Sequence, residues 1–126
     1  MIKVLVIEDD PSLRLLWRLG LEGHGMQVVE AANGVEGLEL ARREHPDVVT
    51  LDVMIPGLDG WGVARQLRAD PSTRDIPIVF LTARAESRDR LRGFELGAVD
   101  YITVPTNPTE LPRKIEAVVE ARSRAQ

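Results

Sequence analysis

The stretch that decides the fold is VVTLDVMIP, residues 48–56, in which a largely apolar run leads directly into the carboxylate of Asp52. An uninterrupted apolar run bounded by turn-forming residues is typical of a strand buried on both faces of a parallel sheet. Pro56 and Gly57 end the run. We therefore expect Asp52 at the carboxyl end of a central strand, the edge at which open α/β sheets bind ligands. Taken alone, a capping or turn aspartate would fit the same pattern.

The rest of the chain repeats the alternation of a short apolar run with a helix-like pattern, five times in all. This alternation predicts an α/β fold with helices on both faces of a parallel sheet. Right-handed crossovers then favour a flavodoxin-like (βα)5 architecture, a doubly wound five-stranded sheet of strand order 2-1-3-4-5. The strands are expected at residues 2–7, 27–31, 48–51, 78–81 and 101–104.

Several helix ends can also be predicted from local chemistry. Ser87 is the expected N-cap of the fourth helix, and Gly97 the expected C-terminal cap. Pro112 would break a helix that began at residue 107, so we expect a loosened or shifted start with Thr109 as the cap. The polar residues 120–126 are expected to fray.

Composition limits the classes of protein that remain. A chain of 126 residues with 44% hydrophobic and 29% charged residues predicts one soluble domain spanning residues 1–126. The net charge of -4 argues against a general nucleic-acid-binding surface, and the lack of cysteine excludes disulfides and thiolate chemistry. The sequence shows neither a signal peptide nor a membrane-length apolar stretch, so we expect a cytoplasmic protein.

Acidic and hydroxyl side chains follow three of the predicted strands. Glu8 and Asp9 follow the first strand, Asp52 the third and Thr82 the fourth. Carboxylates that converge repel one another unless a cation or raised pKa values relieve the repulsion. With no histidine or cysteine nearby, an open all-oxygen site favours Mg2+. An aspartate beside such a cation and a hydroxyl suits phosphoryl transfer to the carboxylate.

The alternative for the acidic run after the first strand is helix capping, because anions are favoured at helix N-termini. We accept this interpretation for Asp10 and prefer the site interpretation for Glu8 and Asp9.

Together these segments identify a family. The chain resembles the response-regulator receiver domain of two-component signalling (CheY-like) over essentially its whole length, through the segments IEDD, LDVMIPGLDG, FLTA and GAVDYITVP. The resemblance implies that Asp52 is the phosphoacceptor and that a histidine kinase or a phosphotransfer protein supplies the phosphoryl group. It also implies that Glu8, Asp9, Asp52 and the backbone carbonyl of Met54 hold Mg2+.

The same resemblance assigns the switch residues. Thr82 matches the hydroxyl that moves toward the phosphoryl group, and Ala83 matches the small residue whose backbone N–H faces a phosphoryl oxygen. Tyr101 matches the aromatic residue whose rotamer reports the switch. The Val104–Pro105 peptide bond is expected to be cis, because the matching bond of the family is cis.

One position departs from the family pattern. Val104 stands where the family has a lysine before the proline, and Thr106 replaces a large apolar residue. A valine provides no cation for the aspartate or the phosphoryl oxygens, so we expect a weakened coupling to Thr82. Arg84, two residues after Thr82, is hypothesised to act as a surrogate cation, because guanidinium pairs well with phosphate. An exposed arginine without a role is the alternative.

Three other functions remain open to different degrees. A pseudo-receiver that binds proteins without phosphorylation is the main alternative. An aspartyl-phosphate hydrolase would need a second aspartate where Met54 stands, and a dinucleotide-binding domain would need a glycine-rich loop where the acids stand. We therefore expect a signalling domain that is not an enzyme in the ordinary sense and catalyses at most its own phosphorylation and dephosphorylation.

The expected output is through protein contacts, with no direct binding to nucleic acid or membrane. The family's usual partner surface is formed by the fourth helix, fifth strand and last helix. In this sequence it carries basic residues, for which a solvated helix face is an equally good explanation; these are Arg88, Arg90, Arg92, Arg113 and Lys114.

Overall fold

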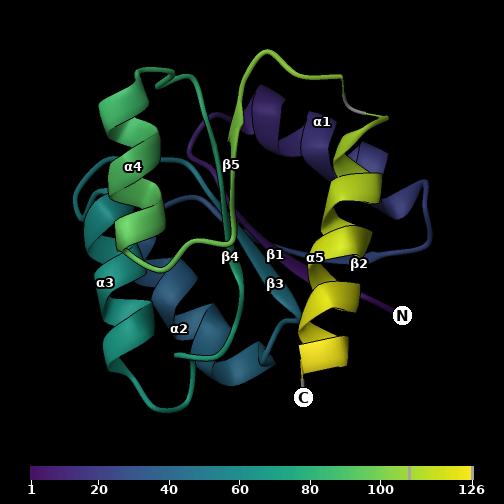
Figure 1. The fold of residues 1–126 in the computed structure, drawn as a ribbon. Helices are drawn as coiled ribbons and strands as arrows, with labels where there is room; N and C mark the ends of the chain where they lie inside the picture. The colour runs from purple at the N-terminus through teal and green to yellow at the C-terminus, as the bar shows by residue number, and fades with distance from the viewer. Residues whose placement is uncertain (108, 126) are drawn as a thin grey trace.

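The computed structural model describes residues 1–107 and 109–125 and has a central parallel sheet between two layers of helices (Figure 1). The sheet has five strands in the order β2-β1-β3-β4-β5, as predicted. Helices α1 and α5 cover one face, and α2, α3 and α4 cover the other. The elements are β1 (Lys3–Ile7), α1 (Pro11–Glu22), β2 (Gln27–Ala31), α2 (Gly34–Glu44), β3 (Val48–Leu51), α3 (Gly60–Ala69), β4 (Ile78–Thr82), α4 (Ser87–Glu95), β5 (Asp100–Thr103) and α5 (Leu111–Ala125).

The sheet separates two apolar clusters, one under each helix layer. Strand β1 serves both, because successive side chains of a strand point to opposite faces. Leu5 and Ile7 belong to the cluster beneath α2 and α3, whereas Val4 and Val6 belong to the cluster beneath α1 and α5. Burial on both faces explains why the central strands are uninterrupted apolar runs.

The parallel register brings the carboxyl ends of the strands to one edge. Ile7 of β1 pairs with Leu51 of β3, and Leu51 pairs with Phe80 of β4. The residues that follow β1 and β3 are therefore neighbours, although more than forty positions separate Glu8 from Asp52 in the chain.

The helix ends agree with the predictions in part. Gly97 adopts a left-handed conformation (φ 92°) just after α4. Its N–H and that of Ala98 donate to carbonyls of α4, so its role in the C-terminal cap is confirmed. Ser87 is not the N-cap: it is the first residue of α4, and Glu86 holds the cap position without a side-chain hydrogen bond. The serine lies one residue too late to reach the free N–H groups.

Helix α5 starts later than a Thr109 cap requires. The helix begins at Leu111, and the N–H of Lys114 donates to the carbonyl of Glu110, so the cap position is one residue beyond Thr109. Pro112 thus lies in the first turn, where a missing N–H costs nothing, as the expected shift required. The helix continues to Ala125, so residues 120–125 form its last turns. These are the residues for which the sequence predicted fraying.

Two further features of the β5 region bear on the site. The Val104–Pro105 peptide bond is cis, which confirms the prediction. Strand β5 begins and ends one residue earlier than predicted, so Val104 already lies beyond the strand. Nevertheless, the N–H of Val104 still donates to the carbonyl of Thr82 at 2.9 Å.

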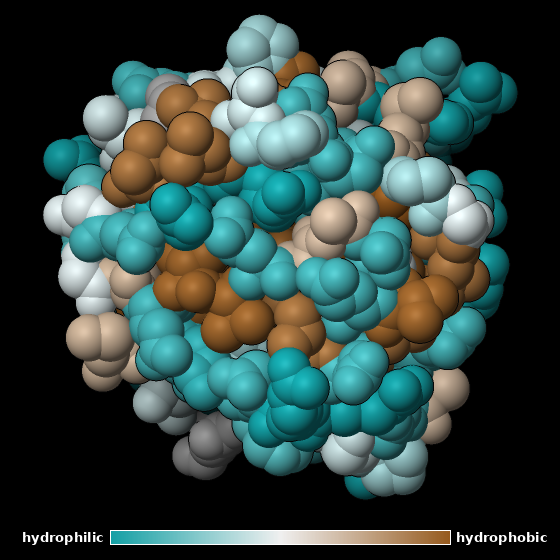
Figure 2. Space-filling model, turned by 180° about the vertical axis from the view of Figure 1, so that it is seen from behind, coloured by the Kyte–Doolittle hydropathy of each residue, from teal (hydrophilic) through white to brown (hydrophobic). Residues whose placement is uncertain are grey.

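Helix α4 packs on the sheet with unusual residues. Its buried positions are Asp89 and Gly93, whereas Leu91 and Phe94 are 59% and 44% exposed. Apolar surface also occurs in patches among hydrophilic residues on the rear of the molecule (Figure 2). In the described residues, none of the helices combines the length and the apolar character that crossing a membrane requires.

Candidate functional site

Three carboxylates meet at the carboxyl edge of the sheet. Glu8, Asp9 and Asp52 each offer an oxygen, and these oxygens all lie within 4.8 Å of one another. Glu8 is buried at 4% exposure, Asp52 is half-buried and Asp9 is exposed. The cluster is therefore open to solvent on one side, and the structure brings together the three acidic residues that the sequence predicted as ligands.

The electrostatics of the cluster centre on Glu8. Burial first, and then the negative charge of Asp52, raise the pKa of the Glu8 carboxyl from an ordinary 4.5 to about 8. The N–H of Asp10 donates to Glu8 Oε2 at 3.2 Å and opposes this rise. The raised pKa favours the protonated form of Glu8, and a bound divalent cation would favour release of that proton.

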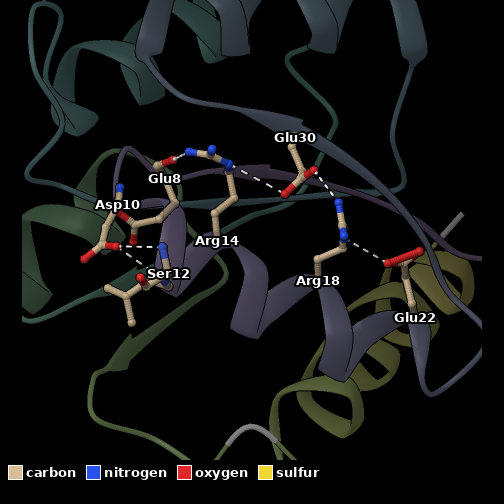
Figure 3. A network of polar contacts seen from close by, with 8 residues as sticks. Glu8, Asp10, Ser12, Arg14, Arg18, Glu22 and Glu30 are labelled. Atoms are coloured by element: carbon tan, nitrogen blue, oxygen red, sulfur yellow. Dashed lines mark hydrogen bonds and ion pairs between the residues drawn. The ribbon is translucent and has the colours of Figure 1, made fainter.

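The loop after β1 is fixed by helix α1. Asp10 is the N-cap of α1, and its Oδ1 accepts hydrogen bonds from the N–H groups of Ser12 (2.8 Å) and Leu13 (3.3 Å), so its predicted capping role is confirmed. Arg14 donates to the carbonyl of Glu8 at 2.8 Å (Figure 3). This leaves the side chain of Glu8 free to face the cluster.

Arg14 also belongs to a chain of ion pairs that ties α1 to β2. Its Nε lies 3.6 Å from Glu30, and Glu30 pairs with Arg18 at 3.1 Å (Figure 3). Arg18 in turn pairs with Glu22, one turn along the helix, at 3.1 Å. These contacts fix the position of α1 relative to the edge that carries Glu8.

Asp52 is held by the turn that follows β3. Its Oδ1 accepts the N–H of Met54 at 3.0 Å. Gly60, the first residue of α3, packs so closely that a Cβ there would lie 2.4 Å from the backbone oxygen of Asp52. Only glycine therefore allows α3 to begin directly against the end of β3.

A cavity of about 440 Å³ opens beside the acidic cluster. Its lining comes from the loops after β1, β3 and β4 and from the start of α3. The lining residues are Asp9, Val53, Met54, Ile55, Pro56, Asp59, Trp61 and Arg84. Trp61 was not among the predicted site residues, because its position at the start of α3 gave no signal beyond helical spacing.

The loop after β4 joins the predicted switch residues to one another. Thr82 is buried at the end of β4, and its Oγ1 accepts the N–H of Arg84 at 3.3 Å. Tyr101 is buried, and its hydroxyl donates to the carbonyl of Arg84 at 2.7 Å. Ala83 is exposed between them. Burial is the main cause that raises the pKa of Tyr101 to about 12, so its hydroxyl remains a donor.

The guanidinium of Arg84 lies beside Asp89 rather than Asp52. Its Nη2 donates to Asp89 Oδ1 at 3.1 Å, and this contact raises the pKa of Arg84. Asp89 is buried on the inner face of α4, and sequence reasoning missed it. A carboxylate at that position of an amphipathic helix looks solvent-facing until the partner loop is placed against it.

Val104 lies where the resemblance expects a lysine. Its side chain is partly buried and packs against the apolar cluster beneath α1 and α5. Thr106, two residues on, is half-buried. The valine therefore adds apolar contact and no charge near the acidic cluster.

The basic residues of the predicted partner surface have different surroundings. The guanidinium of Arg92 lies 4.8 Å from the ring centre of Trp61 and so faces α3. Arg90 lies 5.4 Å from the Tyr101 ring centre and donates to the Tyr101 carbonyl at 3.2 Å. Arg88 pairs with Glu86 at 2.8 Å, and Arg113 and Lys114 are exposed.

Comparison with known proteins identifies the family. The model of the "Response regulator receiver domain" family matches residues 4–116 of this chain. The chain therefore belongs to the receiver domain family of two-component response regulators, a family of signalling domains, not a classical enzyme family.

Individual relatives cover the chain almost completely. A probable transcriptional regulator, ycf27, from Porphyridium aerugineum is 44% identical over 98% of this chain, which spans 50% of that protein. Protein PilH from Pseudomonas aeruginosa is 40% identical over 94% of this chain and 98% of its own length. The chain thus spans about half the length of the first of these relatives and nearly all of the second.

A solved structure carries the same fold and a metal. The receiver domain of a sensor histidine kinase from Pseudomonas aeruginosa is 30% identical, has a TM-score of 0.87 and matches 94% of this chain and 98% of its own. It is described with a magnesium ion coordinated in its active site cleft. In this chain the all-oxygen donor set of Glu8, Asp9 and Asp52 fits such an ion.

The acidic cluster yields a direct test of metal binding. Asp9→Asn should weaken Mg2+ or Mn2+ binding by roughly tenfold, because it removes one of three convergent carboxylates. Asp10→Asn is the matched control and should leave affinity nearly unchanged, because that side chain caps α1. Titration followed by Trp61 fluorescence measures both affinities, and equal losses in the two variants would contradict the assignment.

Proposed function

We propose that residues 1–126 form one receiver domain in which Asp52 accepts a phosphoryl group from a histidine kinase or a phosphotransfer protein. The observation that carries the proposal is the half-buried Asp52 carboxylate beside Glu8 and Asp9, with a cavity that Asp9 also lines. Membership of the receiver family supports the same role.

The reaction is a transfer between two nucleophiles. A carboxylate oxygen of Asp52 forms a bond to phosphorus while the N–P bond of a phosphohistidine breaks, and the imidazole nitrogen leaves with the electron pair. Water later hydrolyses the acyl phosphate, which releases inorganic phosphate and returns the carboxylate. Glu8, Asp9, Asp52 and the Met54 carbonyl would hold Mg2+, whose charge would offset that of the phosphoryl oxygens.

The loop after β4 is suited to sense the new group. In the proposal, the Thr82 hydroxyl and the N–H of Ala83 donate to phosphoryl oxygens once these occupy the cavity. Any movement of Thr82 also acts on Tyr101, because both contact Arg84 through its backbone. Phosphorylation thereby alters the surface formed by α4, β5 and α5, the proposed site for a downstream protein target.

The coupling is proposed to be weaker than in a lysine-bearing receiver. Val104 packs into an apolar cluster and supplies no charge to the phosphoryl oxygens. Arg84 lines the same cavity as Asp9 and is the proposed surrogate cation. The same packing of Val104 favours the second candidate, a pseudo-receiver that binds proteins without phosphorylation and, like the first, without direct contact to nucleic acid.

Intact mass spectrometry separates these two functions. After incubation with a small phosphodonor and Mg2+, the protein should gain the mass of one phosphoryl group. Asp52→Asn should gain none, because an amide cannot form the acyl phosphate. A parent protein that stays unmodified at every donor concentration would favour the pseudo-receiver.

The role of Arg84 is tested together with Val104. Arg84→Ala should slow phosphorylation of Asp52 or shorten the phosphoryl lifetime several-fold, because a cation is lost from the cavity. Val104→Lys should reduce this sensitivity, since two cations acting on the same oxygens are not additive. Rates are followed by intact mass, and identical rates for the parent and Arg84→Ala would remove Arg84 from the mechanism.

A further inference from the structure

The contact between Arg84 and Asp89 is the starting point. Asp89 presents a carboxylate with 8% side-chain exposure on the inner face of α4, next to the loop after β4. In the part of the chain that the structure describes, its side-chain hydrogen bond is to Arg84. Burying a carboxylate costs free energy unless the carboxylate is paired, so the contact with Arg84 stabilises the buried Asp89.

Arg84 has a second destination within reach. Its side chain is 40% exposed and lines the cavity that Asp9 also lines, and Asp9 belongs to the acidic cluster with Asp52. Its backbone is fixed by two hydrogen bonds. Its N–H donates to the hydroxyl oxygen of Thr82, and its carbonyl accepts from the Tyr101 hydroxyl. The flexible side chain can therefore exchange partners without a change of the loop.

We propose that Asp89 is a positioning residue that holds Arg84 away from the acidic cluster until a phosphoryl group on Asp52 competes for the guanidinium. The inference rests on the proposed phosphorylation and adds the residue that regulates the surrogate cation. Guanidinium can form bidentate contacts with both groups, but a phosphoryl group carries more negative charge than a carboxylate, so it is the stronger partner.

Departure of Arg84 has a consequence for α4. The carboxylate of Asp89 then lies buried and unpaired near Tyr101, whose pKa already responds to the charge of Asp89. That arrangement disfavours the resting position of α4 on β5. The exchange of partners thus transmits the state of Asp52 to the α4 surface without a lysine after β5.

A double-mutant cycle tests the positioning role. Asp89→Asn should raise the rate of Asp52 phosphorylation by about two- to fivefold, the range expected for a half-exposed ion pair. The same substitution in an Arg84→Ala background should leave the rate unchanged. Glu95→Gln, which removes an exposed carboxylate from the same helix, is the matched control, and Asp89→Glu should behave as the parent. An equal effect of Asp89→Asn in both backgrounds, or a slower rate, overturns the proposal.

Metal affinity provides a readout that does not need phosphorylation. In Asp89→Asn the Arg84 guanidinium should be free to compete with Mg2+ for the acidic cluster, so Mg2+ should bind about twofold more weakly. In the Arg84→Ala background Asp89→Asn should leave Mg2+ binding unchanged. If this shift appears and no variant is phosphorylated, the proposed function and the competition by a phosphoryl group both fail, whereas the holding of Arg84 by Asp89 stands. If the parent is phosphorylated and Asp89→Asn leaves the Mg2+ affinity unchanged, the proposed role of Asp89 is wrong and the proposed function stands.

The unmodified protein supplies a test that is independent of how the variants fold. Nitrogen-15 NMR of the Arg84 guanidinium should show a shift when beryllofluoride, a phosphoryl mimic, binds with Mg2+. A resonance that stays unchanged with the mimic bound would show that Asp89 keeps the guanidinium, and the proposal would be wrong.

Discussion

The repulsion among Glu8, Asp9 and Asp52 is the constraint on which the rest of the site depends. The parallel register of β1 and β3 places these carboxylates together, and the apolar burial of both strands leaves them little freedom to separate. Burial is the larger cause of the raised pKa of Glu8, and the negative charge of Asp52 adds to it. A proton can relieve the charge, and so can a divalent cation, which makes the cluster both unstable when fully ionised and selective for a hard cation.

Most of the fold, and the acidic part of the site, could be predicted from the sequence. Short apolar runs bounded by turn-forming residues indicate buried strands by their length. The strand ends then place Asp52 beside Glu8, because all parallel strands end at the same edge. The helix caps were harder to predict. The observed cap positions of α4 and α5 each differ by one residue from the predicted Ser87 and Thr109, because the cap depends on where backbone hydrogen bonding begins. Tertiary pairing could not be predicted, because nothing local shows that α4 buries Asp89 and exposes Leu91.

The backbone of the loop after β4 is fixed by contacts to Thr82 and Tyr101, so only the side chain of Arg84 is free to change its partner. Arg84 therefore differs from a lysine placed after β5 in a physical respect. A lysine there would be a permanent member of the site, whereas Arg84 is shared between the cavity and the buried carboxylate of Asp89. Val104 adds to this difference, because its side chain packs against the apolar cluster beneath α1 and α5 and carries no charge.

The central claim is that burial, and after it the negative charge of Asp52, raise the pKa of the Glu8 carboxyl. Carbon-13 NMR titration of the Glu8 carboxyl measures this directly. The account predicts a pKa near 8 without metal and a large decrease at saturating Mg2+. Because the folded state then binds a proton that the unfolded state has released, the free energy of unfolding should fall as the pH rises from about 5 to about 8 without metal. A Glu8 carboxyl that titrates near its ordinary 4.5, with no response to Mg2+, would contradict the account.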